Sequence, residues 1–231
     1  DEKYMQDLLS LLDAAMDDMP SGALNGLTPK EHKAQKAKEI VTNYKHNEEY
    51  IKQENAHLSK KDVELFYKLY FGILEFTNRK YHVVPGLKIY DAKKLDPRIL
   101  VDVINEFWSK KDSILMEFAF ANPFKFNDEE MKIVRDFRKG IRDLFIIVKY
   151  EEEYTTFLSK DNLYMVKGIN CNIDEIIPNE ELPIPAITTI LPFKDQIVFD
   201  SVLAAQAIKI GTNMRENIIE EVKNSKKIYK L

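Results

Sequence analysis

The fold is decided by the stretch Ala186-Ile187-Thr188-Thr189-Ile190-Leu191-Pro192-Phe193-Lys194-Asp195-Gln196-Ile197-Val198-Phe199-Asp200. It carries the densest β signal in the chain, because two runs rich in β-branched and apolar residues flank a Pro-Phe-Lys-Asp connection. The pattern predicts a β-hairpin, and since neither face is wholly polar we expect both faces to be at least partly covered. Phe193 and Lys194 should be exposed at the turn, while Ile197 and Phe199 should point together into the core.

Other β signals surround this hairpin. Upstream, three β runs separated by an acidic and a polar turn predict an antiparallel meander over 144–149, 154–158 and 163–167. Downstream, we expect a short strand at 207–210, a turn at Gly211 and a helix at 213–226. This helix is expected to cover one face of the hairpin.

The stretch 59–141 has helical periodicity. Ser59 is a predicted N-cap, and Asn127 with a glutamate three residues later resembles a capping box. Gly140 is the expected C′ glycine that ends the last of these helices. Trp108 falls on the apolar stripe of its segment, so we expect it to be buried.

The N-terminal stretch 28–58 reads as one long helix with a thin apolar stripe that includes Val41 and Ile51. A thin stripe favours contact with another protein or a second copy. We therefore divide the chain into an N-terminal helical segment, 1–58, as an arm or oligomerisation helix, a helical subdomain, 59–141, and an antiparallel sheet subdomain with a C-terminal helix, 142–231. The predicted class is α+β, with a helical N-terminal half packed on a mostly antiparallel sheet half that ends in a helix.

Composition restricts the function. The 231 residues carry a formal net charge of −4 with both signs mixed, which gives no electrostatic reason to expect nucleic-acid binding. The single Cys171 excludes an internal disulfide and a cysteine-based zinc site, and it favours a reducing compartment, the cytoplasm. No apolar run is long enough to span a membrane, so we expect no membrane partner.

Motifs of catalysis are missing from the sequence. It contains no P-loop, nucleophile elbow, dinucleotide fingerprint or zinc-protease motif, and we expect no cofactor and no metal. Asp195 and Asp200 flank a predicted strand and could act as a carboxylate pair, although turn chemistry explains such residues more often. For Asp200 the preferred role is to accept backbone N–H bonds at a strand end, and Cys171 is interpreted as an incidental thiol.

One strand-to-helix turn is a candidate anion site, because free N–H groups and the helix dipole favour anions there. The alternative is a plain turn with an N-cap residue. Together with the hairpin, this turn defines the candidate binding residues Lys194, Asp200, Lys209, Gly211, Asn213 and Arg215.

The run Leu191–Ser201 resembles a Leu-Pro-Phe-Lys/Arg-x-x-Ile-x-x-Asp-Gly/Ser pattern of proteins from low-GC Gram-positive bacteria. Tyr154–Leu158, Asn122–Phe124 and Asn78–Tyr81 are similar to segments of the same proteins. Some members carry a C-terminal cysteine-rich zinc motif of the SEC-C type, which this chain lacks, and a Gly-Gly-Gly run where this chain has Gly211-Thr212-Asn213. The group has no assigned activity, so the resemblance implies an α+β layout and a bacterial cytoplasmic origin.

Two functions follow as hypotheses. The first is a non-enzymatic binding or protein-interaction module. The second is a nucleic-acid-linked enzyme or regulator with a site near the hairpin Leu191–Ser201 and the Gly211 turn. Convergence of Lys194, Asp200, Lys209 and Arg215 on one cleft would favour the second hypothesis, and scatter would favour the first.

Overall fold

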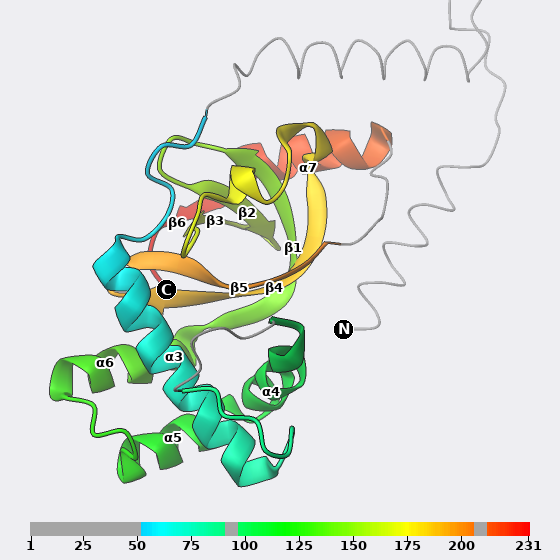
Figure 1. Ribbon diagram of the computed structural model, residues 1–231. Helices are drawn as coiled ribbons and strands as arrows, with labels where there is room; N and C mark the ends of the chain where they lie inside the picture. The colour runs from blue at the N-terminus through cyan, green and yellow to red at the C-terminus, as the bar shows by residue number, and fades with distance from the viewer. Residues whose placement is uncertain (1–51, 91–96, 206–211) are drawn as a thin grey trace, which may run out of the picture. The chain divides into compact units, whose positions relative to one another are not determined.

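The computed structural model describes residues 52–90, 97–205 and 212–231 (Figure 1). The chain forms two compact units. One comprises 51–209 with 221–231, and the other contains 210–220. The helices are α3 (Lys60–Tyr81), α4 (Pro97–Ser109), α5 (Lys111–Ala121), α6 (Asp128–Asp136) and α7 (Thr212–Asn224). The strands are β1 (Ile141–Tyr150), β2 (Thr155–Ser159), β3 (Asn162–Lys167), β4 (Ile184–Phe193), β5 (Gln196–Ala205) and β6 (Lys226–Ile228).

The α+β class is confirmed, because four described helices precede the first strand and α7 lies near the C-terminus. The short 3-10 helices η1 (Phe137–Lys139), η2 (Ile173–Glu175) and η3 (Asn179–Glu181) connect these elements. After α7, the strand β6 adds to the sheet, which the sequence pattern did not predict. The strand expected at 207–210 lies outside the described residues.

The helix expected over 28–58 is wrong for its last residues, because 52–58 are not helical. The Leu58 N–H donates to the carbonyl of Gly168 at 3.2 Å, and the Gly168 N–H donates to the carbonyl of Ala56 at 2.7 Å. In this strap, as we name residues 52–58, His57 pairs in parallel with Gly168, the residue that follows β3. Long-range backbone pairing therefore replaces the helical hydrogen bonds that the local periodicity favoured. The rest of that prediction, with Val41 and Ile51, lies outside the described residues.

Local signals placed the helix starts correctly. The Ser59 hydroxyl accepts the Asp62 N–H at 3.2 Å at the start of α3, and Asn127 forms a full capping box at the start of α6. The role predicted for Gly140 is wrong, since its φ of −57° is not left-handed. A Cβ at Gly140 would lie 2.5 Å from the Trp108 ring, so glycine is required there for close packing. Trp108 is only partly buried, which corrects its predicted burial.

The strands close into a ring. β1, β2 and β3 form the predicted antiparallel meander, β1 also pairs with β4 and β4 with β5, all antiparallel. The parallel pair β3–β5 completes the order β1–β2–β3–β5–β4–β1, and β6 adds to β3 in parallel. Strand β1 has a neighbour on each side, since residues 141–147 pair with β4 and residues 146–150 pair with β2. The β1–β2 pairing has a register shift between Ile147 and Lys149. The result is a five-stranded barrel.

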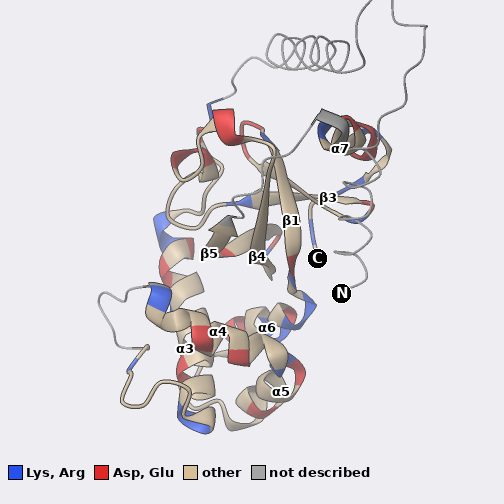
Figure 2. Cartoon of the chain, turned by 90° about the vertical axis from the view of Figure 1, so that its right-hand side faces the viewer, with Lys and Arg blue, Asp and Glu red and all other residues tan. Residues whose placement is uncertain are grey.

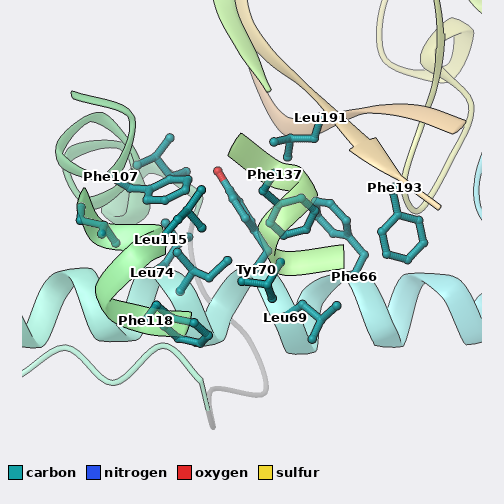
Figure 3. Packing of buried hydrophobic residues seen from close by; sticks show 14 of the residues in the cluster. Phe66, Leu69, Tyr70, Leu74, Phe107, Leu115, Phe118, Phe137, Leu191 and Phe193 are labelled. Carbon is teal, nitrogen blue, oxygen red and sulfur yellow. The ribbon is translucent and has the colours of Figure 1, made fainter. Parts of the chain in front are cut away.

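Two apolar clusters fill this unit. The cluster inside the barrel draws on all five ring strands and includes Ile197 and Phe199, whose shared inward direction is thereby confirmed. The second cluster joins helices α3–α6 to the outer face of β4 and β5 through Leu191, Phe193 and Val198 (Figure 3). Both faces of the hairpin are at least partly covered, as predicted, and the outer face packs on the helical layer α3–α6. The cover expected from the helix at 213–226 stays a prediction. The predicted exposure of Phe193 is wrong, because its side chain is fully buried against Phe66 of α3.

Candidate functional site

The β4–β5 hairpin contains an irregularity at its centre. Thr188 pairs with Leu203 and Ile190 pairs with Phe199, so the single residue Thr189 faces the three residues between Phe199 and Leu203. This is a bulge that leaves backbone groups of β5 without ladder partners. Ser201, in the bulge, has a φ of 64°, the left-handed region that favours glycine. Gly or Ser is also what the pattern compared above has at this position.

Asp200 satisfies one of the groups that the bulge frees. Its Oδ1 accepts the Val202 N–H at 3.1 Å, so the predicted role as an acceptor of backbone N–H bonds is confirmed. The predicted location is wrong, because Asp200 lies inside β5 rather than at a strand end. Its side chain is on the helix-facing side of the barrel and only 3% exposed.

Helix α3 contributes the second partner of Asp200. The Tyr70 hydroxyl donates to Asp200 Oδ2 at 3.3 Å, and Figure 3 shows this hydroxyl directed away from α3 towards the strands. Burial raises the pKa of Asp200 to about 6, against the lowering effects of the Val202 N–H, the Thr189 hydroxyl and the Arg142 charge. Burial, reinforced by the nearby Asp200 charge, also raises the pKa of Tyr70 well above its usual value. The pair therefore holds a proton that is released near neutral pH.

Two further side chains extend the cluster to helix α4. Arg142 of β1 donates through Nη1 to Thr189 Oγ1 at 3.0 Å and through Nη2 to Asn105 Oδ1 of α4 at 2.8 Å. We name the set Asn105, Arg142, Thr189, Asp200 and Tyr70 the inter-layer cluster. It connects two helices to three strands and contains one buried carboxyl group and one cationic side chain.

The residues of the hairpin turn contact other partners than the inter-layer cluster. Lys194 is exposed and forms an ion pair with Asp62 in the first turn of α3. Asp195 is exposed and pairs with Lys230 at 2.7 Å. Since Asp200 is buried with other partners, neither Lys194 nor Asp195 converges on it, and the carboxylate-pair interpretation is not supported by these contacts.

The remaining candidate binding residues cannot be combined with these. Lys209 and Gly211 lie outside the described residues. Asn213 and Arg215 fall in helix α7, within the unit that contains 210–220. The anion site at this turn stays a prediction.

Other candidate chemistry is sparse in the part of the chain that the structure describes. Cys171 is a partly buried free thiol, and burial followed by the charges of Glu175 and Asp174 raises its pKa, which disfavours a reactive thiolate. Among residues 52–90, 97–205 and 212–231, His, Cys, Asp and Glu side chains form no group of three that could hold a metal. None of the described helices has the length and apolar content needed to cross a bilayer.

A surface feature stands out on helix α5. Phe120 is 95% exposed and Met116 is 68% exposed, and they are four positions apart, so they lie on one face of the helix. Neither residue falls on the apolar stripe formed by Ile114, Leu115 and Phe118, which are all buried. α5 therefore presents apolar side chains to the core and to solvent.

Sequence reasoning did not include most of these residues in a site. Tyr70 was counted only as part of an apolar stripe, and nothing local marks Arg142, Thr189 or Asn105 as its neighbours. Apolar residues off the stripe, such as Met116 and Phe120, were a usable signal for a second surface.

No family model, curated protein or solved structure matches the chain.

Proposed function

We propose that this chain is a non-enzymatic protein-interaction module whose contact surface includes Met116 and Phe120 of α5. The exposure of Phe120 carries the proposal, because a fully solvated phenylalanine stabilises nothing in the monomer and aromatic residues and Met are enriched at protein interfaces. Two apolar anchors four residues apart on one helix suit a helix-in-groove contact. The mixed charge of the helices, visible in Figure 2, supports a protein partner over a polyanion.

The test takes a second copy of the chain as partner. Sedimentation velocity over a wide concentration range should show a concentration-dependent assembly for the parent protein, and loss of that assembly for Met116→Asp/Phe120→Asp. Ile176→Asp is the matched control, since Ile176 is 48% exposed and lies next to η2 rather than on α5. If parent and double variant sediment alike as monomers at every concentration, self-association through α5 is refuted.

The nucleic-acid hypothesis has one architectural argument in its favour. Small five-stranded Greek-key barrels of the OB type bind oligonucleotides on the face of strands 2 and 3 and on the adjoining loops. In this barrel the β1–β2 connection carries Glu151, Glu152 and Glu153, and every residue of β2 is buried. A run of glutamates repels phosphate, so we place this function second.

The proposal includes a cytoplasmic location in a bacterial cell. Its support is the single cysteine, which suits a reducing compartment, together with the resemblance described above. Self-association through residues 28–58 remains a prediction for the part of that segment outside the described residues.

A further inference from the structure

We propose that the inter-layer cluster is a proton-controlled latch, which ties helix α4 to the barrel while Asp200 is protonated and loosens α4 when Asp200 is ionised. This inference is independent of the interaction surface on α5. It begins with position: Asp200 is a carboxyl group buried between the helical layer and the barrel, on the outer face of β5 beside the apolar contacts of Val198.

The charged and titratable neighbours of Asp200 are few. From α3, Tyr70 donates to its Oδ2, and Tyr67, whose hydroxyl lies 3.2 Å from Ser201 Oγ and 2.7 Å from Asn170 Nδ2, also senses its charge. From β4, the Thr189 hydroxyl is a neutral donor, and from β1, Arg142 supplies the cationic charge. Asn105 of α4 is neutral and reaches the cluster through Arg142.

In this proposal, Arg142 is the residue that changes partners. In the structure its guanidinium donates to Thr189 on the barrel and to Asn105 on α4, and we assign this arrangement to neutral Asp200. When the proton of Asp200 leaves to solvent, a buried carboxylate remains with the Val202 N–H and two hydroxyl groups as donors. A buried charge demands a counter-charge, so Arg142 is drawn towards Asp200 and away from Asn105. Burial places this proton loss near neutral pH, because it raises the pKa of Asp200 to about 6.

The test is amide hydrogen exchange of the full chain at pH 5 and pH 7.5, expressed as protection factors so that the intrinsic pH dependence of exchange cancels. Amides of α4 should lose protection by about tenfold or more at the higher pH beyond the change in α6, which contributes no residue to the latch and reports the global change in stability. Asp200→Asn should abolish the α4 change. Because histidine also titrates in this range, His57→Gln/His82→Gln serves as the control and should retain it.

A second variant covers the case in which Asp200→Asn does not fold. Asn105 is exposed, so Asn105→Ala should fold, show low α4 protection already at pH 5, and lose the pH dependence. The latch is refuted if α4 protection in the parent protein is equal at both pH values. It is also refuted if Asp200→Asn or Asn105→Ala keeps the full pH-dependent change.

Discussion

The hydroxyl of Tyr70 lies 3.3 Å from Oδ2 of Asp200, which joins a helix and a strand 130 positions apart in the sequence by a buried hydrogen bond. Asp200 also caps the N–H of Val202 that the bulge in β5 leaves free. One carboxyl group therefore stabilises both a local irregularity of the strand and the contact between layers. Burial of this carboxyl group disfavours its ionised form.

Replacing Asp200 should change the pH dependence of stability. Its pKa is about 6 in the folded protein against 3.8 ordinarily, so between these values the folded state binds more protons than the unfolded state. The free energy of unfolding therefore decreases as pH rises through this window, by about 3 kcal/mol for a pKa difference of about two at about 1.4 kcal/mol each. Asp200→Asn should lose this component.

Urea unfolding at pH 4 and pH 7.5 measures this contribution of Asp200 to the free energy of unfolding. Carboxylates with lowered pKa values, such as Asp62 and Asp195, contribute the opposite trend equally to both proteins, so the informative quantity is the difference between parent and variant. An identical pH dependence in the two proteins would contradict the raised pKa of Asp200.

Removing the Tyr70 hydroxyl should destabilise the protein mainly at neutral pH. Tyr70→Phe keeps the ring, which packs 5.4 Å from the ring of Phe66, but takes one donor from a buried carboxylate. We expect a loss of about 1–3 kcal/mol at pH 7.5 and a smaller loss at pH 4, where Asp200 is neutral. Thermal melting at both pH values checks this. Tyr90→Phe, whose ring centroid lies 4.2 Å from that of Phe124, is the control. Equal losses at the two pH values would indicate a packing effect alone.

Truncation of two adjacent residues of the hairpin should cost very different amounts of stability. Phe193 is fully buried, so Phe193→Ala should cost about 3–5 kcal/mol. Lys194 is exposed in its ion pair with Asp62, so Lys194→Ala should cost less than about 1 kcal/mol. Denaturant midpoints measure both. A large effect at Lys194 would show that the pair with Asp62 holds the turn against α3 more strongly than a surface ion pair.

The strap should detach when Gln53 is shortened. Its buried amide donates to the carbonyl groups of Glu151 and Tyr154 at 3.1 and 2.8 Å and to Thr155 Oγ1 at 3.1 Å. Gln53→Ala removes this donor from all three groups, and of them the Tyr154 carbonyl keeps the Glu151 N–H as a second partner. We therefore expect a loss of about 1–3 kcal/mol and faster proteolytic cleavage within 52–58. Lys52→Ala, at an exposed neighbour, is the matched control. Equal cleavage rates in the two variants would mean that Gln53 does not anchor the strap.

Local sequence signals determined the elements that local physics controls. Ser59 and Asn127 cap helices because their side chains reach backbone N–H groups three residues on, within one turn. The alternation that directs Ile197 and Phe199 to one face follows from the two-residue period of a strand. The meander of β1, β2 and β3 follows from short polar turns between apolar runs.

Tertiary structure decided whatever depends on contacts between distant segments. Phe193 lies in the predicted turn of the hairpin, yet the helical layer covers its side chain. No local sequence pattern encodes the position of that layer. Residues 52–58 have helical periodicity, but pairing with Gly168 offers their backbone partners that a local pattern does not reveal. The site at Asp200 required a bulge, defined by the register of two strands, and a tyrosine 130 positions away. Register and long-range pairing are properties of the packed chain, so the sequence determined the elements while only their packing created the cluster between them.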